Sequence, residues 1–331
     1  MSQNLINFFA DKNVLITGGL GFIGSTLAIK LAETGANITV VDSLIPDYGG
    51  NIFNIDPVQD KINVNVSDVR DQNSMDYLIQ DQDYLFNLAG TLSHIDSMKD
   101  PFTDLEINCV SQLRILESCR KNNPNIKIVF AGTRGQYGKC SYNPVDEKHP
   151  LIPIDVNGIN NIAGEQYHIL YNNVYGIKAC SLRLTNTYGP RHQMKHHRQG
   201  VLNWFIRQVI DNTTIKIYGS GSQIRDTSYV DDVVDAFLLA MMHKETPGEV
   251  YNIGGEAFSL VDFVEKLIEI TGKGNYELIE YPDESKAIEI GDYIADYSKF
   301  SELTGWQPKI NLEEGLQKTL AYYKQHKSMY W

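Results

Sequence analysis

Short apolar runs alternate with longer amphipathic segments through the first half of the chain. The runs at 13–17, 37–41, 62–66, 84–88, 126–131 and 180–184 are predicted to be strands. Between them, apolar residues recur at helical spacing and predict helices over 22–34, 102–122 and 160–175. This alternation is typical of βαβ units, so the sequence predicts an α/β fold with a parallel sheet.

Three glycines follow the first predicted strand directly. Gly18, Gly21 and Gly24 are spaced G-x-x-G-x-x-G. The first permits a tight turn, the second lets a diphosphate approach the backbone, and the third lets the helix pack close to its strand. Asp42 ends the second predicted strand, where a carboxylate can bind an adenosine ribose and would repel a 2′-phosphate. The pattern predicts that the chain binds NAD rather than NADP.

After residue 184 the alternation of strands and helices becomes irregular. Helices are predicted at 201–210, 230–242, 260–271 and 312–325, and a strand at 249–253. We therefore expect a Rossmann-type, doubly wound parallel sheet with a smaller mixed α/β lobe. Residues 1–185, with a return segment at about 225–254, form the predicted NAD-binding domain. Residues 186–224 and 255–331 form the predicted substrate-binding lobe.

Charge and composition narrow the class of partner. The 331 residues contain 41 acidic and 29 basic side chains, a net charge of -12, which argues against a nucleic-acid partner. The first residues lack the pattern of a secretory signal, and no apolar run is long enough to span a bilayer. We expect a cytoplasmic protein that binds no membrane.

Metal binding is also disfavoured. The four cysteines include no CxxC pair, and the histidines of the loop 191–198 have no spacing that fixes them on one face. We expect buried, inert thiols, no metal, and a basic loop that contacts substrate or a partner subunit.

The glycine segment Thr17–Gly24 resembles the extended short-chain dehydrogenase/reductases that act on nucleotide sugars, the group of the UDP-glucose 4-epimerases, 4,6-dehydratases and decarboxylases. Other segments are similar to signatures of that family and occur in the same order: 67–71, 87–90, 183–191, 225–233 and 252–255. The resemblance covers almost the whole chain. It implies NAD as cofactor, a nucleotide sugar as substrate and a homo-oligomer.

The resemblance also implies site residues. Cofactor contacts are expected at Gly18, Gly21, Phe22, Ile23, Gly24, Asp42, Ser43, Asp68, Val69, Leu88, Ala89 and Gly90. Substrate contacts are expected at Ser93, His94, Asn186, Arg191, Gln193 and Arg225. Asn186 and Arg225 would hold the diphosphate, since a guanidinium offers a planar fork of donors to phosphate oxygens. The alternative for Arg225 is an ion pair with the neighbouring Asp226.

Thr133 stands where the family has a catalytic Ser or Thr, and its hydroxyl can hydrogen-bond the sugar oxygen that becomes a ketone. The 4,6-dehydratases that the chain resembles carry Asp and Glu in the next two positions. Here these are Arg134 and Gly135, which disfavours dehydratase chemistry.

The family's Tyr-x-x-x-Lys pair aligns with Asn157 and Asn161, so both the usual base and its cation are replaced by amides that do not titrate near neutral pH. Three explanations remain open. Another group acts: Thr133 with a water chain, Tyr137, or His94 with Asp96. Alternatively, turnover is slow and the cofactor is retained, or the protein binds its ligands without catalysis.

The predicted activity is NAD(H)-dependent oxidation at C4 of a nucleotide-activated sugar to a 4-keto product. A dehydrogenase is favoured over a 4-epimerase because the Tyr and Lys are missing. A narrower resemblance is to the GDP-heptose 4-dehydrogenases of bacterial capsule-heptose pathways. The alternative of another class is a non-catalytic protein that binds NAD and a nucleotide sugar.

Overall fold

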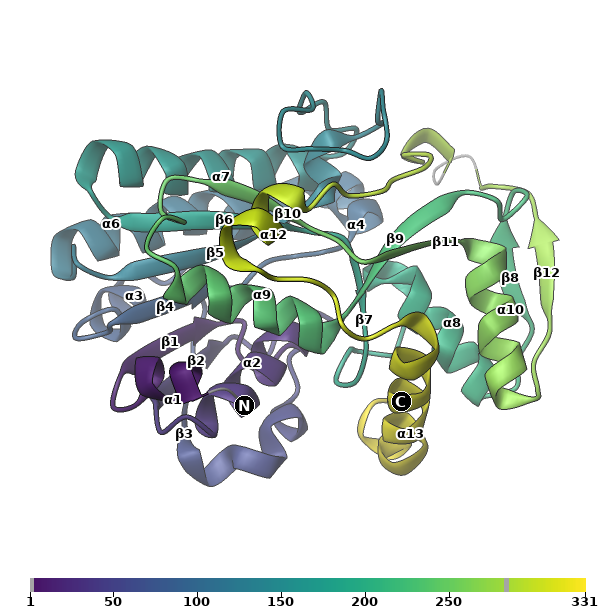
Figure 1. Ribbon diagram of the computed structural model, residues 1–331, viewed down its shortest axis with the longest axis horizontal. Helices are drawn as coiled ribbons and strands as arrows, with labels where there is room; N and C mark the ends of the chain where they lie inside the picture. The colour runs from purple at the N-terminus through teal and green to yellow at the C-terminus, as the bar shows by residue number, and fades with distance from the viewer. Residues whose placement is uncertain (1–2, 283–285) are drawn as a thin grey trace.

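The computed structural model describes residues 3–282 and 286–331, and its core is a seven-stranded sheet (Figure 1). The strand order is β10-β6-β5-β4-β1-β2-β3, and every pairing in it is parallel. The strands are β1 Asn13–Thr17, β2 Asn37–Asp42, β3 Ile62–Val66, β4 Tyr84–Asn87, β5 Lys127–Thr133, β6 Lys178–Leu184 and β10 Val250–Ile253. The order reverses between β1 and β4, which defines a doubly wound sheet and confirms the predicted fold class.

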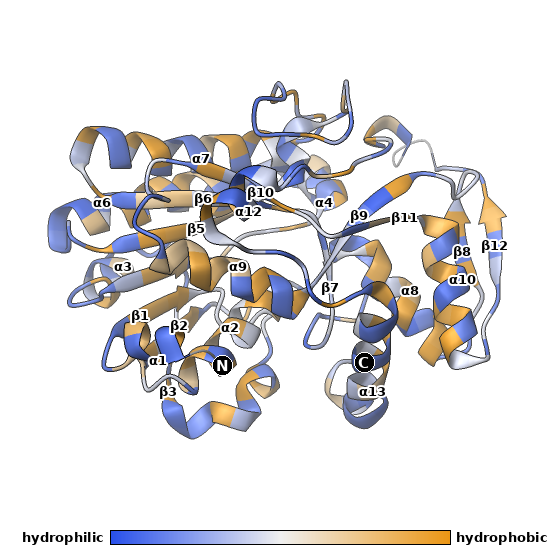
Figure 2. Cartoon of the chain, in the orientation of Figure 1, coloured by the Kyte–Doolittle hydropathy of each residue, from blue (hydrophilic) through white to orange (hydrophobic). Residues whose placement is uncertain are grey.

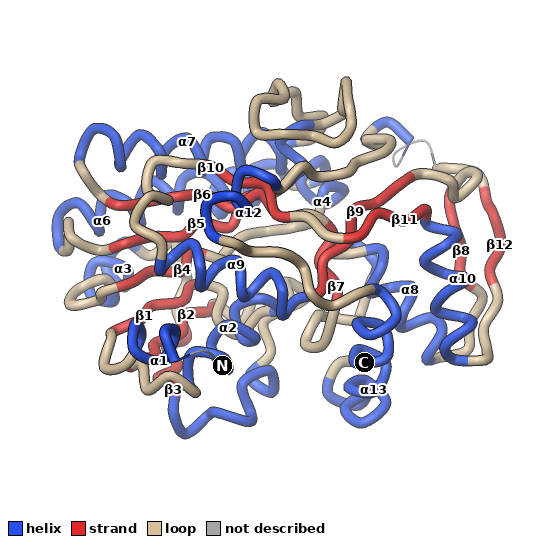
Figure 3. The backbone as a smooth tube through the Cα atoms, in the orientation of Figure 1, coloured by secondary structure: helices blue, strands red, loops and turns tan. Residues whose placement is uncertain are grey.

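Helices surround the sheets on both sides (Figure 3). The α-helices are α1 Gln3–Phe9, α2 Phe22–Ala32, α3 Gln72–Leu78, α4 His94–Lys99, α5 Pro101–Leu105, α6 Ser111–Asn122, α7 Val156–Tyr175, α8 Val201–Ile210, α9 Val230–Met242, α10 Leu260–Thr271, α12 Ser298–Thr304 and α13 Leu312–His326. The π-helix is η2 Glu106–Val110, and the 3-10 helices are η1 Ile52–Lys61, η3 Arg134–Tyr137, η4 His197–Gln199 and η5 Lys327–Met329.

The alternation of side chains along β1 explains why both faces of the sheet are covered. Val14 and Ile16 point to one face and pack in a core with α2 and α9. Leu15 points to the other face and packs with α3, α6 and α7. All three side chains are fully buried. Figure 2 shows the same pattern as hydrophobic strands between helices with mixed faces.

The smaller part of the molecule has its own core around α8, α10 and α13. It contains a three-stranded sheet of β7 Asn186–Tyr188, β9 Ile224–Tyr229 and β11 Glu256–Ser259, and a two-stranded sheet of β8 Ile215–Tyr218 and β12 Tyr276–Ile279. Figure 1 shows this part beside the carboxyl ends of the large sheet. The predicted return to the main sheet is made by α9 and β10, whereas β9 belongs to the small sheet. The domain limits stay a prediction.

Two helices differ from the predicted ranges. The segment predicted as one helix over 102–122 is divided by the π-helical turn η2, in which Asn108 turns towards Thr91 and Asp104. Helix α7 begins at Val156 rather than at residue 160, because the Asp155 side chain caps it by accepting from the Gly158 amide at 2.7 Å. The earlier start places Asn157 inside the helix.

Further elements were not predicted. Helix α1 buries Leu5 and Phe9 against the core of α2 and α9, and α12 buries Phe300 there. The short strands β7, β8, β11 and β12 lie in the segments where hydrophobic periodicity is weak. No helix in the described ranges is long and apolar enough to cross a membrane.

Candidate active site

A cavity of about 740 Å³ lies between the carboxyl ends of the parallel strands and the smaller part of the molecule. Six strands of the large sheet contribute a residue at or just after their ends: Gly18, Asp42, Ser67, Leu88, Thr133 and Leu184. This is the edge at which doubly wound sheets bind ligands. All twelve predicted cofactor residues line this cavity.

The glycine loop forms a cradle that only glycine allows. A Cβ on Gly24 would lie 2.2 Å from the carbonyl oxygen of Gly18, and Gly18 itself has a φ of +66°. A Cβ on Gly21 would meet that same oxygen at 3.2 Å and otherwise project into open space. Gly21 caps α2, whose first amides have no partners within the helix and can bind phosphate. The loop therefore fits a diphosphate.

Asp42 lies at the end of β2 and is held in place by its backbone surroundings. Its carboxylate accepts from the amides of Leu20 at 3.2 Å and Leu44 at 3.0 Å. Burial raises its pKa, while these two hydrogen bonds lower it. An oriented carboxylate at this end of the cradle fits the ribose of NAD.

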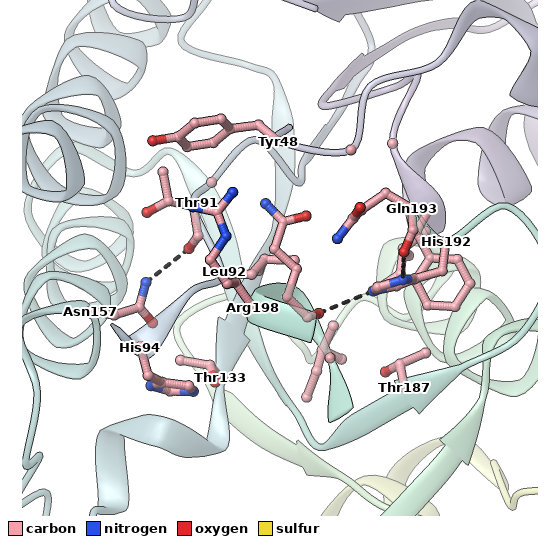
Figure 4. A pocket seen from close by; sticks show the side chains of 18 of the residues that line it. Tyr48, Thr91, Leu92, His94, Thr133, Asn157, Thr187, His192, Gln193 and Arg198 are labelled. Carbon is pink, nitrogen blue, oxygen red and sulfur yellow. Dashed lines mark hydrogen bonds between the residues drawn. The ribbon is translucent and has the colours of Figure 1, made fainter. Parts of the chain in front are cut away.

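Thr133 ends β5, and its hydroxyl oxygen accepts from the Gly135 amide at 3.1 Å. His94 lies beside it (Figure 4). A Cβ built on Gly135 would be 3.0 Å from His94 Cε1 and 3.4 Å from Thr133 Oγ1. The threonine hydroxyl and the imidazole therefore share one corner of the cavity.

The side chains of Asn157 and Asn161 line the same cavity but hydrogen-bond within the protein. Asn157 donates to the carbonyl of Thr91 at 2.8 Å and to Asp104 Oδ2 at 2.9 Å. Asn161 donates to the backbone oxygen of Asn157 at 2.9 Å and to its side-chain oxygen at 3.3 Å. These two amides hold each other and the wall of the cavity in place.

Asp104 is the centre of a buried polar cluster that sequence reasoning missed. Besides Asn157, it accepts from Thr91 Oγ1 at 2.6 Å, Asn108 Nδ2 at 3.0 Å and Asn160 Nδ2 at 2.8 Å. The carboxylate is 3% exposed. The repeated Asn on α7 was the available signal, since buried amides need partners.

Three arginines line the cavity, and two of them, Arg198 and Arg225, are ion-paired with carboxylates. Arg225 pairs with Glu289 at 2.6 Å, not with the neighbouring Asp226. Arg134 donates to Asn186 at 3.5 Å, and burial with the nearby charge of Arg225 lowers the pKa of Arg134 to about 10. Arg198, which was not predicted, also lines the cavity.

Two predicted substrate residues lie outside this cavity. Ser93 is buried and caps α4 by accepting from the Asp96 amide. Arg191 donates to the carbonyl of Asn54 at 3.2 Å, and its guanidinium lies over the Tyr322 ring. His94, Asn186, Gln193 and Arg225 do line it.

The three histidines of the loop 191–198 have separate partners. His192 is buried against Phe22 and hydrogen-bonds the carbonyls of Gln193 and Gln199, and burial lowers its pKa to about 4. His196 contacts the carbonyl of Asp47, and the ring of His197 lies near Trp204. Of the cysteines, Cys119 and Cys180 are buried as expected, whereas Cys109 and Cys140 are half-buried.

Comparison with known proteins identifies the class. The model of the NAD-dependent epimerase/dehydratase family matches residues 14–254, and the chain belongs to this family. The match confirms the predicted family and the predicted cofactor, NAD. When bound, NAD supplies the acceptor for a hydride.

Several relatives and solved structures are similar to this chain over nearly its whole length. A putative UDP-glucose 4-epimerase of Methanocaldococcus jannaschii is 35% identical over 317 residues, which cover 94% of this chain and 98% of the relative. The UDP-glucose 4-epimerase of Thermotoga maritima, solved with UDP-glucose, is 33% identical with a TM-score of 0.85 and covers 95% of this chain and 99% of its own. The Thermus thermophilus UDP-glucose 4-epimerase complex with NAD gives 29% identity and a TM-score of 0.84, with 94% and 99% coverage.

Proposed function

We propose that this protein oxidises C4 of a nucleotide-diphosphate sugar, with bound NAD as the hydride acceptor. The observation that carries the proposal is that the glycine cradle, the Thr133 hydroxyl and three arginine side chains line one cavity. The cradle and Asp42 would hold NAD at one end. At the other end, Arg134, Arg198 and Arg225 suit the diphosphate of a sugar nucleotide.

The fate of the ketone separates two outcomes. The relatives named as UDP-glucose 4-epimerases support return of the hydride to the other face of the sugar, which gives the C4 epimer. Release of the 4-keto product would make the protein a dehydrogenase, as the missing Tyr and Lys suggested. A heptose substrate and a place in capsule synthesis stay predictions that no relative named above supports.

A second candidate is a binding protein without turnover. It is supported by one observation: Asn157 and Asn161, which the sequence aligns with the family's base and cation, are hydrogen-bonded to the protein. In that case NAD and the sugar nucleotide would bind, and no hydride would move.

The deciding experiment incubates NAD-loaded protein with UDP-glucose, CDP-glucose, dTDP-glucose and GDP-mannose in turn. Absorbance at about 340 nm reports reduced nicotinamide, and analysis of the recovered sugar nucleotide distinguishes a 4-keto product from a C4 epimer. Hydride transfer to NAD or formation of the epimer supports the proposed enzyme. Tight binding of a sugar nucleotide with neither change supports the binding protein.

We also propose that the chain forms a homo-oligomer in the cytoplasm. Large apolar side chains are exposed on neighbouring helices of one face: Phe102 on α5, and Leu170 and Val174 on α7. Phe102 is 76% exposed, which is unfavourable for an isolated subunit. Sedimentation analysis of wild type and a Phe102→Glu, Val174→Glu variant tests this, because the variant is expected to be monomeric.

A further inference from the structure

His94 is placed as a histidine that can exchange a proton with a ligand. It begins α4, and its side chain is 41% exposed towards the cavity. Nδ1 lies 2.7 Å from Asp155 Oδ2. Nε2 has no hydrogen-bond partner in the part of the chain that the structure describes. Because a carboxylate can only accept, Nδ1 carries the hydrogen and Nε2 keeps its lone pair.

Thr133 completes the corner. Its oxygen accepts from the Gly135 amide, and its own hydrogen makes no bond to any described residue. Since His94 Cε1 and Thr133 Oγ1 are close to the same point beside Gly135, one sugar hydroxyl can contact both side chains.

The other side chains considered as the general base already bind partners within the protein. The Tyr137 hydroxyl is buried between Asn252 and Arg183, each at 2.7 Å, and burial raises its pKa to about 12. Asp96 pairs with Arg198 at 3.1 Å and lies outside the main cavity. The side-chain amide of Asn157 donates a hydrogen bond to Asp104.

Resting on the proposed function, we infer that His94 accepts the proton of the sugar hydroxyl, in the role that the family gives to its tyrosine. The C4–H bond breaks and its electron pair leaves as hydride to NAD. The O–H bond breaks, its proton goes to His94 Nε2, and the C4–O double bond forms. When the ketone is reduced, both transfers run in reverse and the protonated imidazole returns the proton. Thr133 orients the sugar oxygen by donating its free hydrogen.

Asp155 is the positioning residue for this histidine. One carboxylate oxygen accepts from His94 and the other caps α7. Burial raises the pKa of Asp155, but the hydrogen bonds from His94 and the Gly158 amide, together with nearby positive charge, lower it below its ordinary value. A charged carboxylate here stabilises the imidazolium that forms when the proton arrives.

The test uses single-turnover hydride transfer with NAD-loaded protein and the four sugar nucleotides named above. For His94→Ala we expect the rate of hydride transfer to fall by about 10²- to 10⁴-fold, the usual contribution of a general base. NAD affinity should stay within about twofold of wild type, because the base does not hold the cofactor. Added imidazole should restore part of the lost rate in His94→Ala.

Two further variants separate a chemical role from a structural one. Asp155→Asn keeps an acceptor for the α7 cap and removes the charge beside His94, so we expect a rate loss of about 10-fold or more without unfolding. Met98→Gln changes an exposed residue of the same helix, outside the cavity, and should keep the wild-type rate.

The pH profile adds a second readout. Asp155, the N-cap of α7, pairs with His94 and is itself near the positive charge of Arg134 from η3, and on α4 Asp96 pairs with Arg198. Wild-type hydride transfer should decline towards acid pH, because a general base must be free of a proton before it can accept one, and this decline should be absent in His94→Gln.

Unchanged rate and unchanged acid limb in the folded His94→Ala and His94→Gln variants would overturn the role of His94 and leave the proposed function standing. No hydride transfer by wild type with any of the four sugars would overturn both.

Discussion

Asn157 Nδ2 donates to Asp104 Oδ2 at 2.9 Å, so the residue predicted to replace the family's tyrosine binds a buried carboxylate. Thr91, Asn108 and Asn160 donate to the same carboxylate. A tyrosine at position 157 would remove one of these donors. The predicted replacement of the catalytic tyrosine is therefore linked to the buried Asp104 cluster.

A cation at position 161 should strengthen cofactor binding. Asn161 lines the cavity, and its amide contacts only the turn of Asn157. Asn161→Lys adds a charged donor beside the expected ribose, so we predict about 3- to 10-fold tighter NAD binding by calorimetry. Asn161→Met, of similar length and without charge, should not tighten it. Equal NAD affinity in Asn161→Lys and wild type would mean that residue 161 does not face the ribose.

A side chain at Gly21 should block the cofactor without unfolding the protein. A Cβ there meets the Gly18 oxygen at 3.2 Å and otherwise points into the cavity. We predict that Gly21→Val abolishes NAD binding while stability changes by less than about 1 kcal/mol. Gly24→Val should instead lower stability, because its Cβ would lie 2.2 Å from the Gly18 oxygen. Calorimetry measures NAD binding by both variants, and urea unfolding measures their stability. Normal NAD binding by Gly21→Val would contradict the proposed role of this loop in holding the cofactor.

Asp226 should make stability depend on pH. It is fully buried and accepts from the amides of Gly255 and Ala295, yet burial raises its pKa from 3.8 to about 6. The folded state therefore binds more protons between these values, and this group's contribution to stability falls as pH rises through that window. The change is at most about 3 kcal/mol.

Urea unfolding of wild type and Asp226→Asn at about pH 4 and pH 7 isolates this effect, since other groups titrate alike in both proteins. We predict that wild type loses stability relative to the variant as pH rises. A constant difference between the two proteins would show that Asp226 keeps its ordinary pKa.

Substitutions of the buried ion pair Arg183 and Glu165 should have strongly non-additive effects on the free energy of unfolding. Arg183 Nη2 lies 2.5 Å from Glu165 Oε1, and their side chains are 4% and 0% exposed. Arg183→Met leaves the carboxylate uncompensated and should cost about 3–5 kcal/mol. The double variant Arg183→Met, Glu165→Gln should be less destabilised than Arg183→Met alone. Additive losses in urea unfolding would contradict the coupling.

Sequence patterns within short segments predicted the glycine loop and the strands of the large sheet. The glycine spacing located the loop before α2, because a Cβ on Gly24 would lie 2.2 Å from the Gly18 oxygen and Gly18 itself has a φ of +66°. Central strands of the large sheet such as β1 and β5 were found because burial on both faces makes them continuously apolar, whereas the edge strand β3 is mostly exposed. Hydrophobic periodicity did not find β7, β8 or β11, which are short and partly exposed.

Contacts between distant segments could not be predicted. His94 and Asp155 are far apart in the sequence and meet only because α4 packs against α7. Arg225 was given Asp226 as the alternative partner because the two are adjacent, yet neighbours on a strand point to opposite sides, and its actual partner is Glu289. The role of each placed residue towards ligand stays a prediction.

Thr185 alone joins β6 to β7, and its hydroxyl donates to the Asp226 carbonyl at 2.8 Å. The chain thus crosses from the large sheet to the small one in a single residue that is itself tied down. Such a junction leaves little length for a hinge. We therefore expect the two walls of the cavity to keep their spacing at this junction when ligands bind.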